Sequence, residues 1–500
     1  MLGHCFNLFN YLNLSSFFIL TIVLSTTYIM WNTYLNGRVN IPGPIPWPIV
    51  GNLPMLLRTK NPNILFLELK MKYGNIVYFT LGSQPFVLCF GFKLIHDVLV
   101  KYGDKTKFRP LWLRSFVKLF KGQTSLVFSN GQEWVAGRKF TAAALKDFGV
   151  GTKSIEERIH EETRYLIDFF SKSQNSSIDA SKLFPKVASN VVSNIIFGER
   201  FDHEDPEFIR LLENVQFIIE QNSPFRPDNF FPILEVFRTT NQLQAAVERF
   251  NETKECIRRR IDKQRLTFDP CVIRNFLDLY LAQEGKQDSK ISESYLFNTI
   301  VDMYFAGTDT TSGALQWCML YMLKFPDVQL KCRAEILEAI GDSRLPKLSD
   351  REDLSYVNAT LHEIQRIATT APMAVPHTTL EDIYIEGKLI PKKSILLCDL
   401  MSVHLDPIVW NEPDIFRPER FLDDKGHFLR SENFCPFSLG PRQCVGKHLG
   451  EAELFLIFTS LLQRFDLIKA NPDQTLSTEG KQTFVTLEPQ PYEMKFVIRN

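Results

Sequence analysis

The segment Phe437-Ser438-Leu439-Gly440-Pro441-Arg442-Gln443-Cys444-Val445-Gly446 places one cysteine directly before an apolar helix, which we expect to run from about Gly446 to Phe465. A sulfur at a helix N-terminus faces unpaired backbone N–H groups and the positive end of the helix dipole. Both lower the pKa of a thiol and hold the sulfur anionic. The segment therefore predicts that Cys444 is ionised and able to bind a metal.

The residues around Cys444 favour haem as the group that carries this metal. An anionic sulfur on haem iron pushes electron density towards dioxygen and favours cleavage of the O–O bond. Gly440 and Gly446 let the backbone pass close to a flat macrocycle. Phe437 can shield the sulfur from water, and Arg442 can pair with a haem propionate. Cys444 alone would be more typical of an inert buried cysteine, but these five positions in register favour an iron ligand.

This segment matches the haem-binding signature Phe-x-x-Gly-x-Arg-x-Cys-x-Gly, and the chain thereby resembles the cytochromes P450. The Pro-rich segment Ile41 to Pro48 resembles that of the microsomal branch, which includes vertebrate drug-, steroid- and vitamin-D-hydroxylating members. The resemblance implies a mainly α fold with small β-sheets, built as a single large domain around haem b. It also implies a monooxygenase that inserts one oxygen atom of O2 into a lipophilic substrate of the steroid, fatty acid, vitamin or xenobiotic type.

The periodicity of the chain agrees with such a fold. Residues 76–81 and 85–90 are rich in β-formers and flank a Gly-Ser pair, which predicts a hairpin. Helical periodicity prevails from about 132 to 345 and includes a long helix over about 292–323. Residues 382–397 are again β-rich, and 487–497 predicts strand with a Pro-rich turn.

A second motif, Ala306-Gly307-Thr308-Asp309-Thr310-Thr311, lies inside the long predicted helix. Ala306 and Thr310 share a helix face because they are four residues apart. Gly307 and the run of hydroxyls weaken the helix locally and can admit water. We expect Asp309 and Thr310 to relay protons to dioxygen, and the resemblance implies that Ala306 lines the haem. The alternative is a helix with ordinary threonines and one aspartate.

Three further residues are expected to form a structural triad. Glu363 and Arg366 are three residues apart on a predicted helix, and an exposed pair of this kind contributes only ~0.2–0.5 kcal/mol. The resemblance implies instead that both are buried together with Arg420 of Pro418-Glu419-Arg420-Phe421. Such a triad would fix the segment that leads to Cys444.

The resemblance also assigns residues to the haem propionates. Trp134 and Arg138 face the same way on a predicted helix and would join Arg442 there, and His377 is the histidine at a matching position. The alternatives are a surface tryptophan lying over an arginine stem and a histidine that is a structural hydrogen-bond donor.

A substrate pocket is implied on the haem face opposite Cys444. The apolar side chains expected to line it are Phe116, Phe217, Phe225, Ala306, Val375 and Phe484. An apolar pocket reached from a membrane suits a small lipophilic substrate.

The N-terminus carries no charged side chain before Arg38, and Phe17 to Trp31 is almost wholly apolar. With its neighbours this run reaches the ~20 residues that span a bilayer. Basic residues prevail over 38–72, which predicts that this side faces the cytosol. We expect a membrane anchor over residues 1–36, a Pro-rich hinge over 37–53 and a haem-thiolate catalytic domain over 54–500. The alternative is a cleaved signal peptide, although no basic n-region precedes the run.

The resemblance places this anchor in the endoplasmic reticulum membrane, with the catalytic domain in the cytosol. Nine cysteines without a Cys-x-x-Cys pair suit a reducing compartment, and a formal net charge of zero argues against nucleic acid as a partner. No Gly-x-Gly-x-x-Gly loop for NADPH is evident. Electrons are expected from NADPH–cytochrome P450 reductase or a cytochrome b-type donor, which would dock beside Arg138, Lys139, Lys146 and Lys447.

Three other functions remain open at this point. A haem-thiolate isomerase or dehydratase would use the fold without activating dioxygen, although the Asp309-Thr310 pair argues against it. A non-catalytic haem protein could sense or transfer electrons, and a membrane-tethered scaffold would bind no haem. Oxygen consumption, substrate-induced spin change and a carbon monoxide difference spectrum distinguish these possibilities.

Overall fold

The computed structural model describes residues 14–34, 39–59, 61–147, 155–173, 176–221, 225–231, 241–284, 291–482 and 486–498. As predicted, these residues form a mainly α structure with small sheets. The helices of the N-terminal half are α1 (Leu14–Tyr34), α2 (Leu53–Leu57), α3 (Pro62–Tyr73), α4 (Phe92–His96), α5 (Gly103–Thr106), α6 (Arg114–Phe120), α7 (Gly131–Asp147), α8 (Ile155–Lys172), α9 (Ala180–Phe197) and α10 (Pro206–Gln221). Those that follow are α12 (Asn241–Arg265), α13 (Phe276–Gln283), α14 (Glu293–Lys324), α15 (Pro326–Ala339), α16 (Ser355–Ala368), α17 (Met401–His404) and α18 (Lys447–Arg464).

The predicted hairpin forms the edge of the largest sheet. Strands β1 (Ile76–Leu81) and β2 (Gln84–Phe90) pair antiparallel, and β7 (Ile395–Asp399) and β4 (His377–Thr378) complete the order β1-β2-β7-β4. Strands β5 (Ile383–Ile385) and β6 (Lys388–Ile390) pair antiparallel, with the turn at Gly387.

The C-terminal strands form two smaller sheets. One has the order β3-β11-β8, and the other pairs β10 with β9. Their bounds are β3 (Ile178–Asp179), β8 (Phe465–Lys469), β9 (Gly480–Gln482), β10 (Leu487–Pro489) and β11 (Glu493–Ile498).

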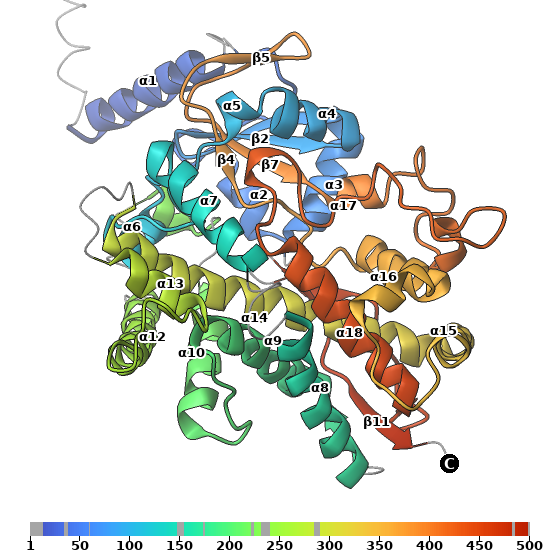
Figure 1. Cartoon of the computed structure of the whole chain (residues 1–500). Coiled ribbons are helices and arrows are strands. Elements are labelled where there is room, and N and C mark those ends of the chain that lie inside the picture. The colour runs from blue at the N-terminus through green and yellow to red at the C-terminus, as the bar shows by residue number, and fades with distance from the viewer. Residues whose placement is uncertain are drawn as a thin grey trace, which may run out of the picture.

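Helix α14 crosses the middle of the molecule, with strands β2, β4 and β7 on one side and helices α8, α9 and α10 on the other (Figure 1). The side chain of Ser292 caps its first turn by accepting from Tyr295 N at 3.2 Å. Phe325 and the following Pro326 mark its end. Most of its side chains are buried, yet Ala306 and Thr310 are exposed in the middle of this core helix.

The described part of the predicted hinge lies against the sheet. Tyr78 N donates to Pro42 O at 2.9 Å, and Thr80 N donates to Asn52 Oδ1 at 3.0 Å. A Cβ on Gly43 would lie 1.7 Å from Tyr78 O, so only glycine permits this approach. These residues therefore pack as part of the body.

Residues 1–13 and 35–38 of the predicted anchor and hinge lie outside the described residues. Helix α1 falls within the predicted anchor. Among the described residues, no helix combines the length and the hydropathy needed to cross a membrane.

Candidate active site around Cys444

The loop before α18 is folded back on itself so that Cys444 is presented at the helix start. Cys444 N donates to Phe437 O at 3.0 Å, and Gln443 N donates to Gly440 O at 3.0 Å. Gly440 has a φ of 73°, and a Cβ there would lie 1.9 Å from Leu99 O. The turn therefore requires glycine both for its backbone angle and for the close approach of the neighbouring chain.

The Cys444 thiol is accessible but has protein on most sides. Burial raises its pKa, while the Gly446 N–H, which hydrogen bonds to the sulfur, and the positive charge of Arg138 lower it. The prediction that the helix start lowers the pKa is thus wrong for the net shift, because desolvation outweighs the two favourable interactions. A metal ion deprotonates a coordinating thiol outright, so ligation itself would supply the thiolate.

The exposed face of α14 carries the second predicted motif. Thr310 Oγ1 donates to Ala306 O at 2.7 Å, which joins the two exposed residues one turn apart. A Cβ on Gly307 would lie 2.5 Å from Val192 Cγ2, so Gly307 lets α9 pack closely against α14. We interpret this glycine as a packing residue rather than as a point that opens the helix.

The Asp309 side chain is in contact with the segment that leads into β10. Its Oδ2 accepts from Thr486 Oγ1 at 2.8 Å. Burial raises the pKa of Asp309 to about 6, and the Thr486 hydrogen bond opposes this rise. The carboxyl can therefore gain and lose a proton near neutral pH.

Arg442 is buried, and only some of its guanidinium N–H groups have hydrogen-bond partners. Its guanidinium lies 3.8 Å from the centre of the Trp134 ring, and its Nε donates to Lys107 O at 2.8 Å. Its Nη2 donates to Ser129 O, whereas Nη1 is buried without a hydrogen-bond partner. Burial, with Arg109 and Arg138 nearby, lowers the pKa of Arg442 to about 8.

Arg109 is a member of this cluster that the sequence did not reveal. Its Nη1 donates to Val375 O at 2.8 Å and to Pro376 O at 3.0 Å, which fixes the segment before His377. Burial, followed by the charge of Arg138, lowers its pKa to about 9. The only signal in the sequence is an arginine before a proline in a loop, which is too common to predict a site.

Arg138 and His377 complete the cluster. Arg138 Nη2 donates to Gln443 O at 2.5 Å, which ties α7 to the cysteine loop. His377 Nδ1 lies 2.9 Å from Thr106 O. Burial, and next the charge of Arg109, hold the pKa of His377 well below its usual value.

These groups suit haem. The charge of Arg138 lowers the pKa of Arg109, and Arg109 and Arg138 both lower the pKa of Arg442. Within the described part of the chain, none of the three is paired with a carboxylate. Buried cations without counter-ions are costly, and the propionates of haem would supply the missing negative charge. The orphaned Arg442 Nη1 is a donor ready for such a group.

Comparison with known proteins agrees with this geometry. A family model described as Cytochrome P450 matches residues 41–496. The chain belongs to the cytochrome P450 family. It is accordingly a monooxygenase, as its signature predicted, and the scaffold alternative is excluded.

Individual relatives extend over nearly the whole cytochrome P450 chain. Cytochrome P450 2B4 of Oryctolagus cuniculus is 37% identical over 471 residues, covering 93% of this chain and 95% of the relative. Cytochrome P450 2D1 of Rattus norvegicus is 35% identical over 480 residues, covering 92% of each. Cytochrome P450 2G1 of Rattus norvegicus is 34% identical over 506 aligned residues, covering 100% of each.

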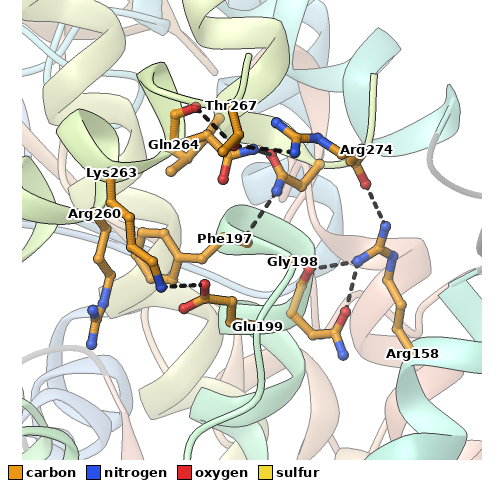
Figure 2. A pocket seen from close by; sticks show the side chains of 12 residues that line it. Arg158, Phe197, Gly198, Glu199, Arg260, Lys263, Gln264, Thr267 and Arg274 are labelled. Atoms are coloured by element: carbon orange, nitrogen blue, oxygen red, sulfur yellow. Dashed lines mark hydrogen bonds and ion pairs between the residues drawn. The ribbon is translucent and has the colours of Figure 1, made fainter. Parts of the chain in front are cut away.

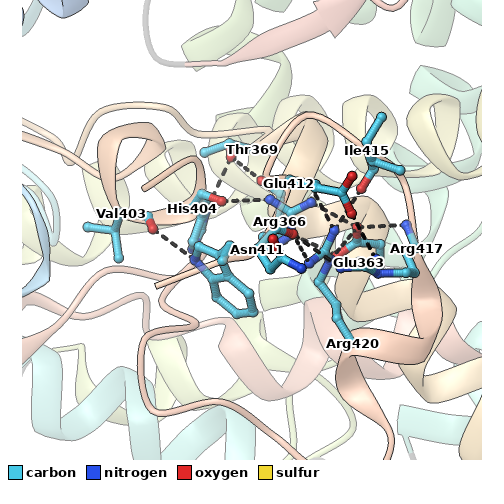
Figure 3. A network of polar contacts seen from close by, with 11 residues as sticks. Glu363, Arg366, Thr369, Val403, His404, Asn411, Glu412, Ile415, Arg417 and Arg420 are labelled. Atoms are coloured by element: carbon cyan, nitrogen blue, oxygen red, sulfur yellow. Dashed lines mark hydrogen bonds and ion pairs between the residues drawn. The ribbon is translucent and has the colours of Figure 1, made fainter. Parts of the chain in front are cut away.

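The triad of this cytochrome P450 is assembled around Glu363 (Figure 3). Arg366 Nε donates to Glu363 Oε2 at 2.7 Å, and Arg420 Nε donates to Glu363 Oε1 at 2.9 Å. Glu363 and Arg366 are fully buried. Arg417 N also donates to Glu363 Oε1 at 2.9 Å, and Arg366 Nη1 donates to His404 O at 2.7 Å. The network thus joins α16 to the turn Pro418–Phe421.

The predicted pocket phenylalanines take part in aromatic and cationic contacts. Phe116 lies 4.2 Å from the Phe128 ring, and Phe225 lies 5.7 Å from the Phe66 ring, both between ring centres. Phe217 lies under the Arg249 guanidinium at 4.2 Å. Of the other three predicted pocket residues, Ala306 is exposed, Val375 is half-buried and Phe484 lies outside the described residues.

A separate pocket of about 480 Å³ shares no residue with this site. It lies between α8, α9, α12 and α13 and is lined by cations whose contacts are drawn in Figure 2. Lys263 pairs with Glu199 at 2.9 Å, and Arg158 Nη2 donates to Arg274 O at 2.8 Å. Because these cations are already engaged, we interpret this pocket as a helix junction.

Proposed function

We propose that this cytochrome P450 uses haem b, held by Cys444, to insert one oxygen atom of O2 into a small lipophilic substrate. The observation that carries the proposal is the accessible thiol of Cys444 beside three cations, of which Arg109 and Arg442 are buried and Arg138 is half-buried. When bound, haem supplies the reductive activation of dioxygen, which the thiolate promotes. The other oxygen atom leaves as water and consumes protons and electrons from outside the substrate.

The chain's own residues would orient the cofactor and move protons. Trp134, Arg138, His377 and Arg442 would seat the propionates. Phe437, Gly440 and Gly446 would shape the cysteine loop. Ala306 would line the opposite face. Asp309, whose pKa is about 6, would hold a proton near neutral pH, and the Thr310 hydroxyl would pass it to dioxygen as dioxygen is reduced.

The substrate pocket would lie beyond Ala306 and be lined by Phe116, Phe217, Phe225, Val375 and Phe484. Its apolar character supports a substrate of the steroid, fatty acid, vitamin or xenobiotic type. Spin-state shifts in a panel of such compounds would narrow this range.

Electrons would come from NADPH–cytochrome P450 reductase or a cytochrome b-type donor. Lys139 and Lys146 are exposed on α7, and Lys447 opens α18. A pocket of about 280 Å³ beside the cysteine loop includes Arg430 and Lys447 in its lining. An acidic partner surface would complement these charges.

We further propose that the protein is held at the endoplasmic reticulum membrane by its N-terminal segment, with the catalytic domain in the cytosol. The exposed apolar side chains of α1 support this, since Phe17, Ile19 and Leu24 are all about 60% exposed. Such a run would be stable in lipid rather than in water.

A carbon monoxide difference spectrum of the reduced protein tests the proposed ligand. The wild type should show the long-wavelength Soret band of a thiolate-ligated haem, and Cys444→Ser should abolish it. Cys435→Ser is the matched control, because Cys435 is buried in the same loop region and should leave the band unchanged. If Cys444→Ser kept this Soret band, the assignment of Cys444 as the iron ligand would be wrong.

Oxygen consumption and spin-state change separate the proposed reaction from the two alternatives that also bind haem. An isomerase or dehydratase would form product without consuming oxygen, and a sensor would show no spin change with any substrate. The acid–alcohol pair Asp309-Thr310 favours oxygen activation.

A further inference from the structure

A second carboxylate, Glu488, lies over the same face of α14 as Asp309. A Cβ built on Gly313 would lie 3.6 Å from Glu488 Cγ, so the Glu488 side chain covers Gly313. Gly313 is four residues after Asp309 and shares its helix face. The Glu488 side chain therefore contacts α14 about one helical turn, ~5 Å along the axis, beyond Asp309.

The segment that carries Glu488 is fixed against α14. Thr486 and Glu488 are two residues apart on an extended segment, so their side chains point to the same side. Thr486 Oγ1 donates to Asp309 Oδ2 at 2.8 Å. The intervening Leu487 accepts at its carbonyl oxygen from Trp317 Nε1 at 2.7 Å. Thr486 thus contacts Asp309 while Glu488 lies one turn further along the helix.

The charges around this pair come from three elements. Burial, and then the negative charge of Asp309 on α14, raise the pKa of Glu488 to about 7, with a further contribution from Glu220 on α10 and an opposing one from Lys481 on β9. Glu220 also raises the pKa of Asp309. Glu220 and Lys481 form an exposed ion pair at 3.3 Å. Asp309 and Glu488 therefore retain a proton between them near neutral pH. The exposed pair Glu220 and Lys481 lies beside them at the protein surface.

We propose that Glu488 is a positioning residue that reloads Asp309 with a proton after each delivery, an inference that rests on the proposed function. Asp309 gives up its carboxyl proton through Thr310 and becomes a carboxylate. Glu488 transfers its own proton to that carboxylate, and solvent beside Glu220 and Lys481 returns a proton to Glu488. Only protons move in these steps, so the electron count is unchanged.

The test uses the full-length holoenzyme with its reductase in phospholipid vesicles. Glu488→Gln removes the proton but keeps the shape, Glu488→Asp keeps the acid, and Glu479→Gln is a matched control on an exposed residue of the same terminal region. With dodecanoic acid as the lipophilic probe, Glu488→Gln should raise the fraction of NADPH electrons recovered as hydrogen peroxide. It should also slow water formation by about tenfold, less than the ~100-fold expected when a direct proton donor is lost.

The pH profile separates a proton relay from a structural effect. In the wild type, water formation should decline as pH rises through about 7, because the reloading acid loses its proton. In Glu488→Gln the decline should move to lower pH, where Asp309 acts alone. Glu488→Asp should restore a decline near neutral pH, and Glu479→Gln should behave as the wild type.

A second readout does not depend on turnover. Because the folded-state pKa of Glu488 is raised, its ionisation costs stability as pH rises from about 4.5 through 7. Glu488→Gln should therefore raise the unfolding temperature at pH 8 by clearly more than at pH 5. An equal difference at both pH values would overturn the proposal, because the carboxyl would then hold no proton near neutrality.

The results for Asp309, Thr310 and Glu488 variants also distinguish a failure of the Glu488 role from a failure of the proposed function. If Asp309→Asn slows water formation while Glu488→Gln does not, Glu488 has no part in the relay and Asp309 keeps its assignment. If Asp309→Asn and Thr310→Ala both leave water formation unchanged, the proposed relay itself fails. Loss of the thiolate Soret band in the wild type would remove the underlying function.

Discussion

At the scale of single residues, burial decides which carboxyl groups are protonated near neutral pH. Asp302 lies one turn before Ala306 on α14 and is almost fully buried. Its Oδ2 accepts from Val127 N at 2.8 Å, yet burial outweighs this hydrogen bond and raises its pKa to about 7. Since the folded-state pKa exceeds the usual value of 3.8, folding favours the protonated form, and stability falls as pH rises from about 4 through 7.

Asp302→Asn should therefore stabilise the protein at high pH. The amide oxygen can still accept from Val127 N, while the cost of ionisation disappears. That cost is at most about 4.5 kcal/mol, since each pKa unit corresponds to ~1.4 kcal/mol. We expect a higher unfolding temperature than the wild type at pH 8 and little difference at pH 4.5. Asp473→Asn, on an exposed loop, should show no such pH dependence, and a similar response there would refute the explanation.

Single residues also show how far a sequence predicts a site. Cys444, Gly440 and Arg442 are close together in a short segment, so their chemistry could be inferred from spacing alone. Arg109 and Glu488 could not be inferred in this way. The partner of Arg109 is 266 residues away, and Thr486, beside Glu488, contacts a residue 177 positions away. Only the packed fold brings such residues together.

At the scale of elements, the cysteine loop and α18 use glycine for opposite purposes. Gly440 combines a φ of 73° with a neighbouring carbonyl oxygen only 1.9 Å from where a Cβ would be. Gly450 lies within α18, and a Cβ there would meet Phe437 Cε1 at 3.6 Å, an ordinary contact distance. The first glycine is required by geometry, whereas the second only lowers helix propensity.

The two glycines therefore predict opposite results for the same substitution. Gly440→Ala should destabilise the loop by more than the ~1–2 kcal/mol cost of a left-handed residue, because Leu99 must also move. Haem content and the thiolate Soret band should both fall. Gly450→Ala should gain about 0.5–1 kcal/mol and keep the band. If Gly440→Ala retained full haem content, the tight turn would not be needed to present Cys444.

Element boundaries were the most predictable part of the fold. The predicted helix from about 446 to 465 is α18, Lys447–Arg464, and the predicted hairpin is β1 and β2. Both have strong local periodicity and clear flanking residues. The pKa of Cys444 was predicted wrongly because a local pattern contains the helix dipole but not the desolvation caused by distant chain segments.

At the scale of the whole molecule, the N-terminal half is joined to the C-terminal half at the site. Arg109 binds the carbonyl oxygens of Val375 and Pro376, and strand β2 pairs in parallel with β7. The triad around Glu363 then fixes the segment before the cysteine loop. Removing one member of a buried triad leaves an unpaired buried charge, which costs ~3–5 kcal/mol. This network therefore contributes more to the fold than surface ion pairs do.

The contacts of the N-terminal residues indicate where the catalytic body begins. Deleting residues 1–38 removes α1 and none of the contacts between Pro42 or Asn52 and β1. This variant should keep the unfolding temperature and the thiolate Soret band of the full chain but lose its association with phospholipid vesicles. Loss of the band would mean that α1 supports the fold, and persistent vesicle binding would contradict its proposed part in membrane association.

Deletion of residues 1–53 is the variant to compare with deletion of residues 1–38, and it should lower the stability of the protein far more. It also removes Ile41, which is 7% exposed and packs in the core beside the sheet. Burial of one such side chain contributes about 1.5–3 kcal/mol, and each lost hydrogen bond to β1 adds about 1 kcal/mol. We therefore expect a clearly lower unfolding temperature and reduced haem content, because β1 would lose its outer partner. Equal unfolding temperatures for the two truncated proteins would show that residues 39–53 act as a linker and that the body begins at residue 54.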